Sequence, residues 1–124
     1  TPMLSMLNQL LDEPAGTEIR WLHACEHGTQ HAFKEEIQAK SRQHASLQSR
    51  VWYRVPAEQD VQGKDYDFSG TMALEQVTDL IPAKAHYYFC GPLGFMKAIK
   101  AQLLALGIPA DRMHYEVFGP HQDL

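Results

Sequence analysis

The spacing of apolar residues along the chain predicts helices and strands in alternation. Residues 2–11 carry Met and Leu side chains at spacings of three and four, which is the stripe of an amphipathic helix. Compact apolar runs between turn-forming residues predict strands. The predicted helices are 2–11, 31–43, 72–80 and 95–106, and the predicted strands are 18–25, 47–55, 86–90 and 113–118. Residues 57–70 are expected to form a polar connection, and Gly107 to end the last helix.

This alternation predicts an α/β fold, a doubly wound parallel sheet with right-handed crossovers and helices on both faces. Such a sheet normally opens with a strand and a glycine-rich turn before its first helix. Here Thr1 is the expected N-cap and Pro2 the first helical residue, and no initiator Met precedes them. We therefore expect a fold that is truncated at its N-terminus and lacks its first strand.

Length and composition narrow the class of protein. The 124 residues, 44% of them apolar, are expected to form one domain over residues 1–124. A net charge of −4 disfavours binding to nucleic acid or to an anionic membrane surface. No apolar run approaches the roughly 20 residues of a membrane span, so we expect a cytoplasmic protein. Cys25 and Cys90 form neither a disulfide framework nor a metal motif by spacing, which suits a reducing compartment.

Ligands of doubly wound sheets bind beyond the carboxyl ends of the strands, and two ligand-binding segments are expected near the first helix. The helix N-terminus at Thr1 and Pro2 can seat a pyrophosphate, although Thr1 can equally be an N-cap alone. Glu26 follows the next strand, where an acid binds the ribose 2′-hydroxyl and excludes a 2′-phosphate. That role would favour NAD over NADP, while a solvated loop glutamate fits the position as well.

Two later segments are expected at the same edge. Gly91 in the Cys90-Gly91-Pro92 turn lets a planar ligand approach the backbone, and Pro92 turns the chain into the next helix. The Cys90 thiol then faces the ligand, or it is only a small buried hydrophobe. Phe118 can stack on an aromatic ring and Glu116 can place a carboxylate nearby, although core and solvated positions are the commoner roles of these residue types.

Other chemistries have less support in the sequence. His23, Cys25 and His27 alternate, with His31 close by, and an extended segment would place the first three on one face. No second ligand pair of zinc-like spacing accompanies them, so we expect no metal site. Gly-x-Ser-x-Gly, His-Glu-x-x-His and Walker motifs are absent from the sequence, which leaves hydrolase and NTPase functions without support.

Taken together, several segments resemble the C-terminal NAD-binding domain of bacterial flavohaemoglobins, the nitric oxide dioxygenases. The Cys90-Gly91-Pro92 turn is similar to the wider ferredoxin-reductase superfamily, and the ending from His114 to His121 is similar to flavohaemoglobins in particular. The resemblance covers nearly the whole chain. Its segments are 1–4, 21–28, 31–33, 51–53, 88–96 and 114–121.

The resemblance implies an oxidoreductase of three parts. A globin domain holds haem b, a second domain holds FAD, and this module binds NAD(P)H for hydride transfer to the flavin. Electrons then pass to the haem, where nitric oxide is oxidised to nitrate, which detoxifies it.

The same resemblance assigns roles to individual residues. Thr1 and Pro2 correspond to the end of the glycine-rich turn that binds the nicotinamide cofactor, and Cys90 and Gly91 approach the nicotinamide itself. Glu116 corresponds to an acid that tunes the redox centres. The terminal segment lies against FAD, with Phe118 beside the flavin ring, through Val117, Phe118, Gly119 and Pro120.

This chain departs from the family by omission, since the globin, the FAD domain and the first strand are missing. In the family that strand is central, between the strands that contain Cys25 and Cys90, and its loss exposes two unpaired edges. We expect such a fragment to be catalytically inactive alone, and either to recover a strand from another chain or to rearrange its sheet. The alternatives are the NAD-binding domain of another flavin reductase that serves an oxygenase, or a non-catalytic fragment that self-associates through its sheet edges.

Overall fold

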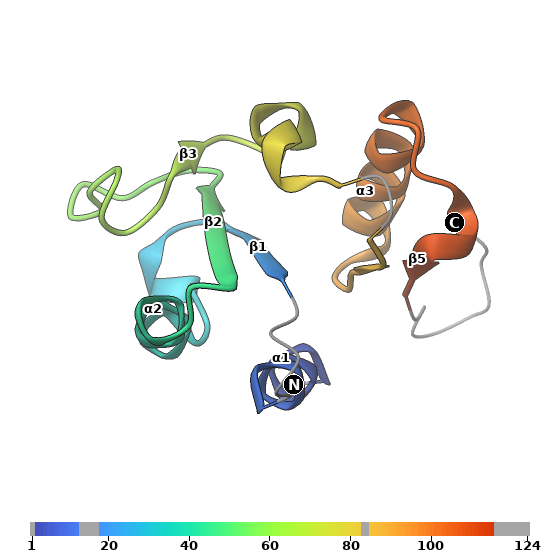
Figure 1. Cartoon of the computed structure of the whole chain (residues 1–124). Coiled ribbons are helices and arrows are strands. Elements are labelled where there is room, and N and C mark those ends of the chain that lie inside the picture. The colour runs from blue at the N-terminus through green and yellow to red at the C-terminus, as the bar shows by residue number, and fades with distance from the viewer. Residues whose placement is uncertain (1, 13–17, 83–84, 116–124) are drawn as a thin grey trace. The chain divides into compact units, whose positions relative to one another are not determined.

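The computed structural model describes residues 2–12, 18–82 and 85–115, and they fall into two compact units, Thr1–Met72 and Ala73–Leu124 (Figure 1). The first unit contains α1 (Pro2–Asp12), β1 (Ile19–Cys25), a short 3-10 helix η1 (Gly28–Gln30), α2 (Lys34–Gln43), β2 (Leu47–Tyr53) and β3 (Phe68–Ser69). The second contains the 3-10 helix η2 (Leu74–Leu80), β4 (Tyr87–Tyr88), α3 (Leu93–Ala105), the 3-10 helix η3 (Ala110–Arg112) and β5 (Met113–His114).

The sheet of the first unit is parallel and has the order β1-β2-β3. β1 and β2 pair along their full lengths, from Ile19 opposite Leu47 to Cys25 opposite Tyr53. Alternate residues of both strands therefore share one face, and the carboxyl ends of the two strands lie level with each other. This register fixes which residues meet beyond the strand ends.

Helices α1 and α2 contribute to the hydrophobic core of this unit together with the sheet. Leu7 of α1, Ile37 of α2 and Leu47 of β2 are each less than 5% exposed and form one cluster. Ile37 is the one buried residue of an otherwise polar α2, which is the narrow apolar stripe expected for a solvated helix. Burial of each such side chain contributes about 1.5–3 kcal/mol. The partly buried residues packed against the cluster are Leu4, Leu11, Ile19, Trp21 and Phe33.

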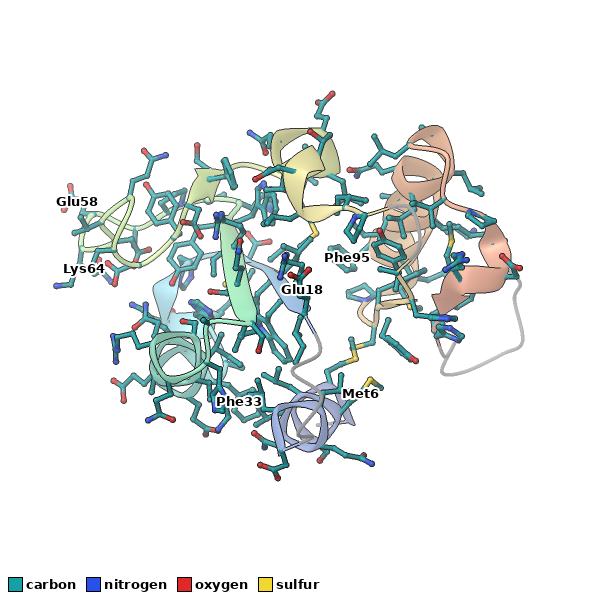
Figure 2. The ribbon with its side chains drawn as sticks, viewed as in Figure 1. Met6, Glu18, Phe33, Glu58, Lys64 and Phe95 are labelled. Carbon is teal, nitrogen blue, oxygen red and sulfur yellow. The ribbon has the colours of Figure 1, made fainter. Side chains whose placement is uncertain are left out.

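Helix α2 begins three residues later than the sequence predicts. Phe33 has a left-handed backbone, with φ of 58°, and the short helix η1 over residues 28–30 was not predicted. The Phe33 ring packs against the core cluster from just before α2, where Figure 2 labels it. Contact with the core therefore places Phe33 in an unfavourable conformation that local sequence does not predict.

The connection after β2 also holds structure that was not expected. Phe68 of β3 stacks on the fully buried Trp52, with ring centroids 4.9 Å apart. The Asp67 carboxylate accepts the N–H of Val51 at 2.8 Å, and the Asp67 N–H donates to the carbonyl of Val51 at 2.9 Å. These bonds attach the polar connection to β2, while Lys64 and Glu58 lie on its outer, exposed side (Figure 2).

In the second unit, α3 connects the parallel strands β4 and β5. Met96, Ile99 and Leu103 form its buried stripe. Gly107, with φ of 88°, ends the helix as predicted, because its N–H donates to Leu104 and the Ile108 N–H donates to Leu103, which is a Schellman motif. The predicted helix over 72–80 is instead η2, a 3-10 segment interrupted at Val77.

The parallel α/β character is as predicted, but the described residues form two sheets rather than one. β4 pairs only with β5, and β1 pairs only with β2, so each has one edge without a partner among the residues described. These are the strands at which the sequence predicts unpaired edges. Two predicted strands are shorter than expected, at two residues each in β4 and β5, and the rest of 113–118 lies outside the described residues.

Candidate functional site

The carboxyl ends of β1 and β2 bring Glu26 and Arg54 side by side. The Arg54 N–H donates to the Cys25 carbonyl as the last bond of the parallel ladder, and the Val55 N–H donates to the Glu26 carbonyl just beyond it, each at 2.9 Å. Both backbones are thus fixed where ligands of parallel sheets bind. Glu26 was predicted at this edge, and Arg54 was not.

The side chains of Glu26 and Arg54 form a two-pronged ion pair. Nε of Arg54 donates to Oε1 of Glu26 at 2.8 Å, and Nη2 donates to Oε2 at 2.6 Å. The hydrogen bonds from Arg54 hold the pKa of Glu26 below its usual value, and the same bonds raise the pKa of Arg54. Both side chains are largely exposed, 42% for Glu26 and 58% for Arg54, so a ligand can reach the pair.

Asp60 joins the loops that follow the two strands. Its Oδ2 accepts the N–H of Gly28 at 3.1 Å and the N–H of Ala57 at 2.8 Å. A Cβ at position 28 would lie 2.4 Å from Oδ1 of Asp60, so the close approach of the two loops requires glycine there. The Cys25 thiol donates to the His27 carbonyl at 3.6 Å in the same loop. These hydrogen bonds therefore fix the backbone of the loops at the carboxyl ends of β1 and β2.

A neutral aromatic cluster lies on the face of the sheet just before this edge. The hydroxyl of the buried Tyr53 lies 2.8 Å from Nδ1 of His31, and the His31 ring lies 4.7 Å from that of His23. Burial, with the nearby charges of His23 and Lys34, lowers the pKa of His31 to about 4, and burial lowers the pKa of His23. Burial raises the pKa of Tyr53 to about 12, so at neutral pH its O–H donates to a neutral His31.

The alternating His23, Cys25 and His27 do not assemble into a ligand set. β1 ends at Cys25, and the His27 ring is instead bonded to the Thr29 hydroxyl at 2.6 Å. Across the part of the chain that the structure describes, no three His, Cys, Asp or Glu side chains are grouped to hold a metal ion. The His23 ring contacts that of His31.

In the second unit the Cys90-Gly91-Pro92 turn joins β4 to α3. Cys90 is exposed, so the interpretation as a small buried hydrophobe is wrong. Gly91 has φ of 147°, and a Cβ there would lie 2.9 Å from the ring of Phe95, so only glycine fits. Pro92 precedes the helix without a side-chain cap, which leaves the first N–H groups of α3 open to an anion. Such a turn fits the close approach of a dinucleotide.

The remaining predicted site residues have little or no description. Pro2 opens α1 as predicted. The other predicted site residues lie outside the described residues: Thr1, Glu116, Val117, Phe118, Gly119 and Pro120. Sequence reasoning missed Arg54 and Asp60. Arg54 lies inside the predicted strand 47–55, whereas β2 ends at Tyr53, so the pattern did not place Arg54 beyond a strand end.

Parallel strands joined by helices, with an acid and glycine turns beyond the strand ends, define a nucleotide-binding α/β domain of the doubly wound class. The chain belongs to the oxidoreductase NAD-binding domain family, whose model matches residues 1–101. No helix within residues 2–12, 18–82 and 85–115 is long and apolar enough to span a membrane.

Flavohemoproteins are among the relatives of the chain. The flavohemoprotein of Chromobacterium violaceum is 46% identical over 123 residues, which is 98% of this chain and 30% of the relative. That of Bacillus cereus is 37% identical over 125 residues, 100% of this chain and 31% of the relative. The chain thus spans less than a third of the length of these relatives, and its resemblance to the NAD-binding domain of flavohaemoglobins is confirmed.

Solved structures confirm the fold of ferredoxin-reductase type. The flavohem-like FAD/NAD-binding domain of nitric oxide dioxygenase from Vibrio cholerae matches with a TM-score of 0.78 and 36% identity, over 97% of this chain and 47% of that one. The CS-b5R domains of human Ncb5or in the NAD+ form match with a TM-score of 0.79 at 14% identity, over 94% of this chain and 33% of that one, which shows the fold alone.

Proposed function

We propose that the chain is the nicotinamide-binding module of a flavohaemoprotein, which presents NAD(P)H for hydride transfer to FAD. The observation that carries the proposal is the pair of main-chain hydrogen bonds that fix the loops beyond β1 and β2, at the sheet edge where doubly wound domains bind the adenosine ribose, and we assign that role to Glu26. Family membership and the 46% identity to a flavohemoprotein support it. When bound, the nicotinamide supplies the hydride.

The other predicted residues complete the module. Thr1 and Pro2 bind the pyrophosphate at the N-terminus of α1, and Gly91 lets the nicotinamide approach the backbone beside the Cys90 thiol. The turn at Gly91, which only glycine fits, and the uncapped start of α3 support these roles. Glu116 tunes the redox centres, and the segment 117–120 contacts FAD with Phe118 beside the flavin.

The parent protein is proposed to be an NAD(P)H-dependent nitric oxide dioxygenase of the cytoplasm, in which separate domains hold FAD and haem b. The relatives are named flavohemoproteins, and the Vibrio cholerae domain is named as part of a nitric oxide dioxygenase. This chain contributes the site for NAD(P)H, so alone it binds the cofactor without turning it over.

Titration of the chain with NADH, monitored by isothermal calorimetry, tests whether it binds the nicotinamide cofactor. We expect saturable binding that weakens by about tenfold in Glu26→Ala, since a hydrogen bond to a charged group contributes about 1.5–3 kcal/mol before competition with Arg54. Glu58→Ala is the matched control, because Glu58 is an exposed acid in the connection after β2. Absence of NADH binding by the wild-type chain would contradict the proposal, and so would NADH oxidation with ferricyanide in the absence of an FAD domain.

The reductase of another oxygenase is the nearest alternative, and a globin encoded upstream in the same reading frame would decide against it. A second kind of function, self-association as a non-catalytic fragment, is favoured by one observation. β1 and β4 each lack a partner on one side among the described residues, and such edges pair readily with other chains.

A further inference from the structure

Two histidine rings meet in the second unit, at the strands β4 and β5. Nδ1 of His86 lies 2.9 Å from Nε2 of His114, and the ring centroids are 5.1 Å apart. His86 comes one residue before β4, and His114 ends β5. Because 28 residues separate the two, the sequence shows no metal motif here, and the parallel pairing of β4 with β5 brings the rings together.

The strand pairing holds the His114 ring in place. The His114 carbonyl accepts the N–H of Phe89 at 3.1 Å. Tyr88, the partner of His114 in the ladder, stacks its ring on the His114 ring with centroids 4.7 Å apart. His114 is half-buried, whereas His86 is exposed. A fixed ring lowers the entropy cost of binding a ligand, and the exposed ring can rotate to complete a site.

The two facing imidazole nitrogens can act as a pair of metal ligands. Their hydrogen bond requires a proton on one of them, and that proton can move through water to the other nitrogen of the same ring. Both rings then stay neutral, and neutral imidazole is the commonest metal ligand in proteins. Rotation of the exposed His86 ring then aims both lone pairs at one ion.

The distance between the two nitrogens indicates the geometry of such a site. Metal–nitrogen bonds of about 2.0–2.1 Å place two ligands about 2.9 Å apart at a right angle and about 3.4 Å apart at a tetrahedral angle. The observed 2.9 Å therefore matches a right angle, which is typical of tetragonal Cu²⁺ and Ni²⁺ sites.

The chemistry of the pair also selects the class of metal. Imidazole nitrogen suits Cu²⁺, Ni²⁺ and Zn²⁺, whereas Mg²⁺ and Ca²⁺ require oxygen ligands. In the described part of the chain no third His, Cys, Asp or Glu side chain is grouped with the two rings, so water fills the other positions around the ion. Such a site is exposed and exchangeable, unlike the closed four-ligand centres that hold structural zinc.

We propose that His86 and His114 form a surface site for a divalent transition metal ion, Cu²⁺ or Ni²⁺ in preference to Zn²⁺, and that the bound ion joins β4 to β5. The inference goes beyond the proposed function, because neither ring is among the residues assigned to the nicotinamide cofactor. An ion that binds only the folded chain stabilises it, by an amount that grows with the concentration of the ion.

Titration of the full chain with NiCl₂ in isothermal calorimetry tests the site, and Ni²⁺ is chosen because it does not oxidise the Cys90 thiol. We expect saturable binding that weakens by at least about tenfold in His86→Ala, because the second imidazole acts at a high effective concentration. His86→Gln keeps a hydrogen-bonding group beside His114 but supplies no imidazole, so it should weaken Ni²⁺ binding equally. His44→Ala removes a histidine at the end of α2, and this matched control should bind Ni²⁺ as the wild type does.

Two further measurements locate the ion. In NMR spectra the imidazole signals of His86 and His114 should shift together on addition of Zn²⁺, and Mg²⁺ should leave them unchanged. Ni²⁺ should raise the midpoint of thermal unfolding of the wild type more than that of His86→Ala.

Equal Ni²⁺ affinity in the wild type and in His86→Ala would overturn this inference, because the ion would then be bound elsewhere on the chain. Absence of saturable Ni²⁺ binding by the folded wild type would overturn it as well. Neither outcome bears on the proposed function, which the NADH titration tests separately.

Discussion

The hydroxyl of Tyr53 lies 2.8 Å from Nδ1 of His31, although 22 residues separate them in the sequence. Tyr53 ends β2 with none of its surface exposed, and His31 follows η1, so this bond joins the strand end to the loop that leads into α2. A buried hydroxyl loses its bonds to water, and a protein partner must replace them.

Replacing Tyr53 by Phe should therefore destabilise the chain by about 1–2 kcal/mol, because His31 loses the partner of its Nδ1 atom while the ring packing stays. Urea unfolding followed by circular dichroism measures this change. Tyr88→Phe is a suitable control, because Tyr88 is 46% exposed and its ring stacks on His114 in both forms. Equal losses in the two variants would show that the bond contributes nothing.

The same cluster predicts a loss of stability in mild acid. The pKa of His31 is lowered to about 4 from 6.5, and that of His23 is also lowered, so between these values the unfolded chain binds more protons than the folded one. Stability is complete above about pH 6.5 and falls as the pH drops towards 4. We expect a loss of the order of 1–2 kcal/mol, since solvent screens the partly exposed rings.

Urea unfolding at several pH values between 7 and 4 checks this prediction. His31→Gln cannot take up the proton, so its stability should depend less on pH over this range than that of the wild type. If the stability of His31→Gln changes with pH as steeply as that of the wild type, the acid sensitivity arises from other groups.

Gly28→Ala should lower stability and weaken nucleotide binding together. Its Cβ would lie 2.4 Å from Oδ1 of Asp60, so the carboxylate must move and lose its bonds to two main-chain N–H groups. We expect a cost of about 1–3 kcal/mol, measured by thermal unfolding with and without NADH. Gly94→Ala is the matched control, because nothing lies within 4 Å of its Cβ and alanine favours the helix by up to about 1 kcal/mol. A Gly28→Ala chain as stable as the wild type would show that Asp60 yields without cost.

Self-association should depend on the outer edge of β1. The N–H of Ile19 and the carbonyl of Cys25 form hydrogen bonds on the β2 side of β1. In a parallel strand the N–H and C=O of one residue point to the same side, and successive residues alternate between the two sides. The N–H and C=O of Leu22 therefore point away from β2. We expect concentration-dependent dimers in light scattering after size exclusion, and a monomer for Leu22→Pro, which removes an outward N–H. Leu22→Ala keeps that donor and should dimerise like the wild type. A monomeric wild type at all concentrations would exclude pairing at this edge.

The elements of the fold that could be predicted are those with a hydrophobic pattern within their own sequence. The apolar stripe of α1 and the runs that form β1 and β2 identify these elements to within about two residues. β3 was not predicted because two residues are too few to show a hydrophobic periodicity. It is stabilised by pairing with the end of β2 and by the stacking of Phe68 on Trp52.

The candidate site divides in the same way. Glu26 could be predicted because its position depends only on the end of one strand. Arg54 could not, because its partnership with Glu26 depends on the register between strands whose ends lie 28 residues apart. Asp60 is less predictable still, since a carboxylate in a polar connection gives no sign of which distant N–H groups it will meet.

Asp60 also has a consequence for how the edge opens. One carboxylate holds the amide protons of Gly28 and Ala57, which belong to the loops that follow β1 and β2. These two amides should therefore show a common protection factor in deuterium exchange, set by a single opening event, even though they are far apart in sequence. The Asp60 carboxylate thus holds the two loops together reversibly. A ligand bound across both loops would slow deuterium exchange at Gly28 and at Ala57 by the same factor.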